Sequence, residues 1–124
     1  MKPKIRVWVC FSDRTKFGKG RARLFELIDE LGSINKAVQK MGMSYRTAWG
    51  YIRELESAAG FQILERTPGR GKEAGARLTR EGRRFIERYR VLQRRVEGGV
   101  QRAFVHAFKQ RSPTLSRRRP RRSP

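Results

Sequence analysis

The sequence is 124 residues long, which suffices for one domain with a modest core and leaves little room for a second. Lys and Arg number 31 against 11 Asp and Glu, so the net charge is +20, and the isoelectric point is about 11.7. This excess is far more than solubility requires and predicts a polyanionic partner. The single cysteine excludes an internal disulfide, and with only one histidine as well, neither a metal nor another cofactor is expected.

The basic charge is spread along the chain. Seven cations lie in the last sixteen residues with no acid among them, so residues 1–108 still carry +13 of the +20. The globular part is therefore basic in its own right, which favours nucleic acid as the partner. No stretch approaches the roughly 20 apolar residues of a membrane span, and the apolar run at residues 5–11 is too short and too polar for a signal peptide. We expect no membrane association and a cytoplasmic, nucleoid-associated protein.

The first predicted elements are a strand and a helix. Residues 5–11 alternate in the manner of a strand, with Cys10 expected to be a buried structural thiol. Residues 12–14, Ser-Asp-Arg, then supply a turn. A helix is predicted after Gly20 and ends at Gly32, because its apolar residues recur at helical spacing: Leu24, Leu27, Ile28 and Leu31.

Residues 32–49 contain two helix starts with a glycine between them. Ser33 and Ser44 can each cap a helix, and Gly42 can close the first one in the left-handed conformation. The first helix has one apolar face, made by Ile34, Ala37, Val38 and Met41. The second has an apolar stripe made by Tyr45, Ala48, Trp49, Ile52, Leu55 and Ala59. This arrangement predicts a helix-turn-helix, and the alternative is an ordinary helical hairpin.

The second of these helices, over residues 45–58, has a polar, basic and small outer face near its N-terminus. That face suits insertion into the DNA major groove, where the first turns of a recognition helix read base edges. The residues that lie off the apolar stripe are Ser44, Arg46, Thr47, Gly50, Tyr51, Arg53 and Glu54.

Downstream, two short apolar runs flank a basic loop rich in glycine. The first contains Phe61, Ile63 and Leu64, and the second contains Ala76, Leu78 and Thr79. This pattern predicts a β-hairpin wing, in which Arg70, Lys72 and Arg77 meet phosphates or the edges of a narrow minor groove. The alternative is a solvated loop.

A long helix is predicted to begin at Thr79, with Glu81 in its first turn. Its apolar residues recur about every 3.5 positions, as in a coiled-coil seam, and predict a homodimer through Phe85, Tyr89, Leu92, Val96 and Ala103. The alternative is that this stripe covers the core of its own domain. Gly98 and Gly99 are expected to be able to break the helix near residue 98. His106 is expected at the surface, and residues 109–124 are expected to be a disordered basic tail after a domain over residues 1–108.

Residues from about 20 to 90 resemble the N-terminal DNA-binding domain of the molybdate-responsive (ModE) regulators and, more distantly, the LysR-type winged helix. The resemblance rests on Gly32-Ser33-Ile34, on Gly42 to Tyr45 with Ala48-Trp49, on Leu64-Glu65-Arg66, and on Ala76 to Thr79 with Glu81-Gly82. It implies a prokaryotic, mainly α winged helix-turn-helix with a small β-hairpin that binds DNA as a dimer. It places Ser44 to Tyr51 in the groove, and Arg66 to Arg77 in the wing. It also places three residues near phosphates, Ser33, Asn35 and Lys36.

The full set of expected DNA-contacting residues comprises Ser33, Asn35, Lys36, Ser44, Tyr45, Arg46, Thr47, Gly50, Tyr51, Arg53, Arg66, Arg70, Lys72 and Arg77. The leading function is a transcription regulator that reads double-stranded DNA and has no effector-binding region within this chain. Its rival is an architectural, chromatin-type protein with little sequence preference, which the charge favours. An enzyme is not expected, because no nucleophile-base pair or metal cluster stands out. RNA binding through charge alone is a further alternative.

Overall fold

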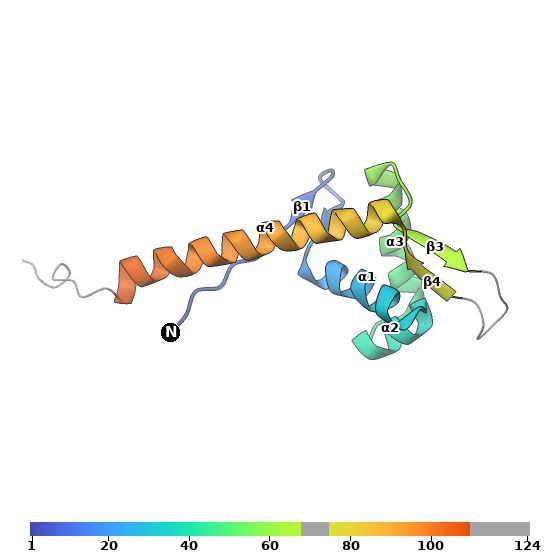
Figure 1. Ribbon diagram of the computed structural model, residues 1–124, viewed down its shortest axis with the longest axis horizontal. Coiled ribbons are helices and arrows are strands. Elements are labelled where there is room, and N and C mark those ends of the chain that lie inside the picture. The colour runs from blue at the N-terminus through green and yellow to red at the C-terminus, as the bar shows by residue number, and fades with distance from the viewer. Residues whose placement is uncertain (68–74, 110–124) are drawn as a thin grey trace, which may run out of the picture. The chain divides into compact units, whose positions relative to one another are not determined.

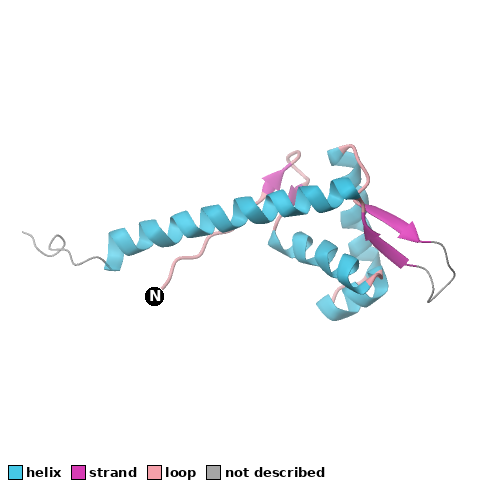
Figure 2. Cartoon of the chain, in the orientation of Figure 1, coloured by secondary structure: helices cyan, strands magenta, loops and turns pink. Residues whose placement is uncertain are grey.

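The computed structural model describes residues 1–67 and 75–109, without the side chain of Lys109. Arg70, Lys72 and the basic tail beyond residue 109 lie outside the described residues. The helices and strands follow in the order β1 (Val9–Cys10), β2 (Lys16–Phe17), α1 (Lys19–Leu31), α2 (Ile34–Met41), α3 (Tyr45–Ala59), β3 (Leu64–Thr67), β4 (Gly75–Leu78), α4 (Arg80–Phe104) and the π-helical segment η2 (Val105–Lys109) (Figures 1 and 2).

Residues 6–92 form one compact unit, and the described residues 1–5 and 93–109 belong to a second unit. Within the first unit, α1, α2 and α3 surround a core to which α4 contributes Ile86 and Tyr89. The strands pair into two separate antiparallel hairpins, β1 with β2 and β3 with β4. In the second hairpin Leu64 pairs with Leu78, and Thr67 pairs with Gly75. This is the predicted winged helix-turn-helix, mainly α with a small β-hairpin and a long final helix.

The predicted N-terminal strand exists, but it is much shorter than expected. Only Val9 and Cys10 pair, with Phe17 and Lys16 respectively, because the partner strand has just two residues. The expectation for Cys10 is wrong, since its thiol is exposed. Alternation along a strand explains this: Val9 is half-buried on the inner side, and its neighbour therefore points outward.

The helix α4 runs through Gly98 and Gly99 without a break, contrary to the expected interruption. Two glycines cost about 1 kcal/mol each in a helix interior, which a helix of 25 residues tolerates. The predicted dimer seam is also partly occupied by the protein itself. Tyr89 is 2% exposed in the core, and its hydroxyl donates to the carbonyl of Val7 at 2.7 Å.

Phe85 is likewise engaged within the first unit. Its ring lies 4.9 Å from that of Phe17 and 5.4 Å from that of Phe11. The first turns of the stripe therefore cover this domain's own core, which is the alternative that the pattern left open. Leu92 and Ala103 are exposed, and Val96 is half-buried. His106 is exposed, as expected.

Candidate nucleic-acid interface

The helix-turn-helix formed by α2 and α3 is built by three local features that the sequence predicted. The Ser33 hydroxyl accepts a hydrogen bond from the backbone N–H of Lys36 at 3.1 Å and caps α2. Gly42 closes that helix with φ of 70°, a left-handed conformation that glycine adopts at little cost. The Ser44 hydroxyl then caps α3 by accepting from the N–H of Thr47 at 3.0 Å. Capping of this kind stabilises a helix by about 1 kcal/mol.

One side of α3 is packed and the opposite side is open. Ala48, Ile52 and Leu55 are buried against α1 and α2. The side turned away from them carries exposed residues that we call the outer face of α3, defined as Arg46, Thr47, Gly50 and Arg53. Within residues 1–67 and 75–109, neither Arg46 nor Arg53 forms an ion pair or a side-chain hydrogen bond. Two uncompensated guanidinium groups thus flank a glycine that leaves the helix backbone open to close approach.

One flank of the outer face is joined to the base of the wing. The guanidinium carbon of Arg66, on β3, lies 4.7 Å from the centre of the Trp49 ring. A nitrogen of the same group lies 3.5 Å from the Tyr45 hydroxyl, and the two aromatic rings meet edge to face at 6.2 Å. A cation over an indole face is attracted by the ring quadrupole. Arg66 therefore holds a positive charge beside the first turn of α3.

The other flank of α3 is closed by α1. Arg21 places its guanidinium 4.0 Å above the ring of Tyr51 and forms an ion pair with Glu54 at 2.9 Å. It also donates to the carbonyl of Lys16 at 2.7 Å. Tyr51, which the sequence analysis placed in the groove, is half-buried at the edge of the outer face under this contact.

The wing is anchored to both sides of the helix-turn-helix. The backbone N–H of Ala76 donates to the carbonyl of Gly32 at 3.1 Å, which ties β4 to the start of α2. In the hairpin, Arg77 pairs with Glu65 at 2.9 Å, although both side chains remain largely exposed. A carboxylate of α3, that of Glu56, accepts from the backbone N–H of Ile63 at 2.8 Å and fixes the chain as it enters β3.

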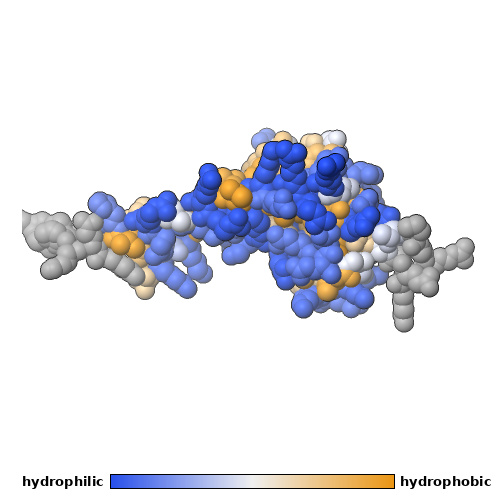
Figure 3. Space-filling model, viewed as in Figure 1, coloured by the Kyte–Doolittle hydropathy of each residue, from blue (hydrophilic) through white to orange (hydrophobic). Residues whose placement is uncertain are grey.

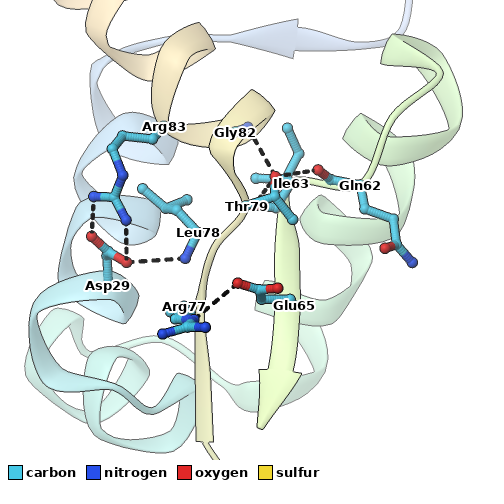
Figure 4. Close-up of polar contacts among 9 residues, drawn as sticks. All are labelled: Asp29, Gln62, Ile63, Glu65, Arg77, Leu78, Thr79, Gly82 and Arg83. Atoms are coloured by element: carbon cyan, nitrogen blue, oxygen red, sulfur yellow. Dashed lines mark hydrogen bonds and ion pairs between the residues drawn. The ribbon is translucent and has the colours of Figure 1, made fainter.

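Asp29 joins α1 to the end of the wing and to α4 (Figure 4). Its carboxylate accepts from the backbone N–H of Leu78 at 3.0 Å and from Arg83 at 2.7 Å. Burial by itself raises the pKa of Asp29, but the hydrogen bonds from Arg83 and Leu78 and the charges of Arg83 and Arg77 outweigh it and lower the pKa below its ordinary value. The same ion pair raises the pKa of Arg83. Both groups are therefore charged at neutral pH.

Thr79 and Gly82 complete this junction (Figure 4). The Thr79 hydroxyl donates to the carbonyl of Gln62 at 2.6 Å and accepts from the N–H of Gly82 at 2.9 Å. A Cβ atom at position 82 would lie 2.4 Å from the carbonyl oxygen of Ile63. The start of α4 and the strand that leads into the wing are thus as close as a glycine allows.

Most of the predicted site residues that the structure describes are exposed on or beside α2, α3 and the hairpin of β3 and β4. Asn35 and Lys36 are exposed on the first turn of α2, beside the half-buried cap Ser33. Ser44 and Tyr45 are exposed at the start of α3. Arg77 is exposed but paired with Glu65. The sequence analysis missed the supporting residues Asp29 and Arg21, because their partners lie 49 and 33 residues away in the sequence and no local pattern announces them.

Among the residues that the structure describes, no group of three or more His, Cys, Asp or Glu side chains is placed to hold a metal ion. No helix in this described part is long and apolar enough to cross a membrane.

The geometry defines the class of protein: a helix-turn-helix whose second helix presents an open basic face, followed by a two-stranded wing. Comparison with known families places it further. Residues 20–83 match the family described as bacterial regulatory helix-turn-helix protein, lysR family. This match covers about half of the chain, and the protein belongs to that family.

Several curated relatives with similar sequences are ModE proteins, as the resemblance implied. The chain is 35% identical over 79 residues to the molybdenum transport protein ModE of Azotobacter vinelandii, covering 64% of this chain and 29% of that protein. It is 35% identical over 92 residues to the transcriptional regulator ModE of Yersinia pestis, covering 74% and 35%. It is 36% identical over 72 residues to the DNA-binding transcriptional dual regulator ModE of Escherichia coli K12, covering 58% and 28%. The chain thus spans about a third of the length of these relatives, or less.

A solved structure has the same fold. The chain described as the crystal structure of a CbnR_DBD-DNA complex superposes with a TM-score of 0.57 at 23% sequence identity, covering 71% of this chain and 95% of that one. This likeness supports the winged helix-turn-helix architecture.

Proposed function

We propose that this protein is a DNA-binding transcription regulator that inserts the outer face of α3 into the major groove. The observation that carries the proposal is the pair Arg46 and Arg53, exposed on either side of Gly50 and without partners in the described structure. Arginine is the commonest reader of guanine edges, and each good bidentate contact contributes about 1–3 kcal/mol of discrimination. The relatives named as regulators support this function and favour a non-enzymatic role.

The surroundings of the outer face supply contacts with the DNA backbone in this proposal. Lys36 and Asn35, at the start of α2, and Arg66, at the base of the wing, face phosphates on opposite sides of the groove. Arg77, Arg70 and Lys72 extend the basic surface along the wing, with Arg70 and Lys72 outside the described residues. Such contacts position a protein on the duplex and carry no sequence information directly.

The decisive experiment compares Arg46→Ala and Lys36→Ala on a preferred site, selected from random DNA, and on unrelated duplexes. We expect Arg46→Ala to weaken binding to the preferred site by about 5- to 150-fold with little effect on other sequences. We expect Lys36→Ala to weaken all sequences alike and to reduce the salt dependence by about one phosphate contact. If Arg46→Ala weakens all sequences equally, α3 does not read base edges as proposed.

The net charge of +20 favours one rival, an architectural protein that coats or bends DNA with little sequence preference. The two functions differ in the ratio of specific to non-specific affinity, which commonly exceeds about 10³ for regulators at physiological salt. Competition of the selected site with random duplex DNA measures this ratio. If random duplex DNA competes as well as the selected site, the regulator function is rejected in favour of the architectural one. Duplex RNA in the same assay distinguishes DNA binding from RNA binding.

A homodimer remains part of the proposal, but its seam contains fewer residues than the sequence predicted. Of the five predicted seam residues, Tyr89 is buried and Phe85 packs against Phe17, whereas Leu92 is 41% exposed. We infer that chains pair through Leu92, Val96 and Ala103, and that the site is a pseudo-palindrome with half-sites about one helical turn apart. Sedimentation at micromolar concentration tests this, and a Leu92→Glu variant should be monomeric.

A further inference from the structure

A row of arginines runs along the start of α4, outside the site proposed above. Arg80, Arg84 and Arg88 follow one another at intervals of four residues, so they lie on one face of the helix. All three are exposed. None of their side chains forms an ion pair or a hydrogen bond with any other residue that the structure describes. The row is about 12 Å long at 1.5 Å per residue.

The row faces away from the core. The opposite side of the same helix turns carries Gly82, Ile86 and Tyr89, all of them buried. The two other arginines in these turns, Arg83 and Arg90, lie on the flanks and are neutralised by Asp29 and Glu26 of α1 at 2.7 Å each. The arginines of this segment thus fall into two sets. One set forms ion pairs that stabilise the fold, and the side chains of the other set have no partner in the described structure. Figure 3 shows that the visible side of these turns is largely hydrophilic.

The row is also remote from the DNA-reading turns of α3. Thr79, directly before it, donates its backbone N–H to the carbonyl of Ile63 at 2.9 Å, and that residue follows the C-terminal end of α3. The proposed groove contacts begin at the other end of this 15-residue helix, about 20 Å away along its axis. The proposed groove contacts therefore lie away from the row, although Arg77 of the wing precedes Arg80 by three residues.

The composition of the row favours a phosphate backbone over an acidic protein. The core of a protein interface is depleted of charge and anchored by aromatic or aliphatic residues, whereas this row consists of arginines, and exposed Val91 and Leu92 lie only beside its last member. Guanidinium groups match phosphate oxygens bidentately. Each strand of duplex DNA carries one charge per about 3.4 Å of axis, so a row of about 12 Å spans three or four phosphates of one strand.

We propose that Arg80, Arg84 and Arg88 form a second DNA-binding surface, which holds the backbone of a second duplex segment while α3 holds the first. This inference rests on the proposed function for the first duplex only. It makes the protein a bridge between two DNA segments and combines a sequence-reading face with a sequence-independent one.

The test is a capture assay with the full chain. One duplex that carries the preferred site is fixed to beads, and a second, labelled duplex of random sequence is offered in solution. The triple variant Arg80→Gln, Arg84→Gln, Arg88→Gln should capture at least tenfold less of the second duplex, and the salt dependence of capture should fall by about two to three phosphate contacts. Its affinity for the fixed duplex should equal that of the matched control below.

The control removes three charges elsewhere, with Lys2, Lys4 and Arg14 changed to Gln, all exposed positions. If both triple variants capture the second duplex equally, the row is not a binding surface and the proposal is overturned. It is also overturned if poly-glutamate or duplex RNA occupies the row in preference to DNA. If instead the proposed function fails and α3 does not bind the preferred site, the result is different: Arg46→Ala leaves binding to the fixed duplex unchanged. Sedimentation of both variants excludes a change of oligomeric state as the cause.

Discussion

The outer face of α3 and the junction between α1, β4 and α4 use arginine in opposite ways. At the junction, Arg83 donates to Asp29 at 2.7 Å, and the carboxylate also accepts from the backbone of β4. On the outer face, Arg46 and Arg53 meet no acid in the described structure. A protein with 31 cations and 11 anions therefore uses carboxylates to fix this junction and leaves the outer face of α3, the proposed groove-reading surface, without an acidic partner in the described structure.

Three further acids of the first unit also pair with arginines. Glu54 pairs with Arg21, Glu26 with Arg90, and Glu65 with Arg77. Each of these contacts lies on a flank of the outer face, within the wing, or between α1 and α4. Exposed ion pairs contribute about 0–1 kcal/mol each. Their larger effect here is to hold selected arginines in place and so determine which of the others remain available.

The largest expected effect is on stability, and it comes from adding one methyl group at the junction. Gly82→Ala places a Cβ atom 2.4 Å from the Ile63 carbonyl oxygen, and the backbone on both sides must shift. We expect a loss of about 3 kcal/mol in the free energy of unfolding, and a fall in Tm on the order of 10–20 °C. Thermal unfolding followed by circular dichroism measures this. Gly20→Ala is the matched control, because its Cβ meets nothing within 4 Å. Equal melting temperatures for the two variants would contradict the close contact.

The same substitution on the outer face should act on binding and not on folding. At Gly50 a Cβ atom meets nothing within 4 Å, and alanine is favoured over glycine in a helix by about 1 kcal/mol. We expect Gly50→Ala to unfold at the native temperature or above it. Because the methyl group projects into the proposed groove surface, affinity for the preferred DNA site should fall about tenfold. Binding by fluorescence anisotropy tests this, and unchanged affinity would remove Gly50 from the interface.

The charged part of the junction should respond to pH. Asp29 has a folded-state pKa below its ordinary value, so its stabilising effect is present above the unfolded-state pKa and is lost as pH falls through the folded-state value. Asp29→Asn keeps an oxygen for the Leu78 N–H but removes the charge opposite Arg83. We expect a loss of about 1 kcal/mol at pH 7, which shrinks below about pH 4. Urea unfolding at both pH values measures it.

A neighbouring acid provides the control for this experiment. Glu30 pairs with Arg23 at 3.4 Å, and the two side chains are 59% and 48% exposed. Glu30→Gln should change stability by less than about 0.5 kcal/mol at either pH. If Asp29→Asn behaves like Glu30→Gln, the junction is held by packing and backbone contacts and not by this carboxylate.

The parts of the fold that could be predicted from sequence are those determined by neighbouring residues. The helix caps Ser33 and Ser44, the end of α1 at Gly32 and the left-handed Gly42 were predicted, because each acts within three or four residues of itself. The apolar side of α3 was predicted for the same reason. Periodicity shows which side of a helix is buried but not what buries it. It therefore left open whether the α4 stripe meets a second chain or, as Phe85 and Tyr89 do, the domain's own core.

The flanks of the candidate site illustrate the same limit. Tyr51 lies near the groove-facing residues in sequence, and only the fold shows that Arg21 stacks on its ring at 4.0 Å. The contact between Arg66 and Trp49 joins residues on different elements, and no local pattern predicts it. Cys10 was misplaced because an apolar run was taken to bury its thiol, whereas the alternation of the strand turns Val9 inward and Cys10 outward.

The contact between Arg66 and Trp49 gives the smallest expected effect. Arg66 combines the two uses of arginine compared above, because it is fixed within the fold and is also available to DNA. It is held within the fold by an aromatic ring at 4.7 Å, yet it has no acidic partner in the described structure. Arg66→Lys keeps the charge and removes the planar group, so DNA affinity should fall about two- to fivefold, the loss expected for an exposed cation–π contact, with an unchanged salt dependence. Arg66→Ala should in addition reduce the salt dependence of DNA affinity by the amount expected for about one phosphate contact. If both variants lose the same salt dependence, the ring contact is needed to present the charge to DNA; if neither does, Arg66 serves the fold alone.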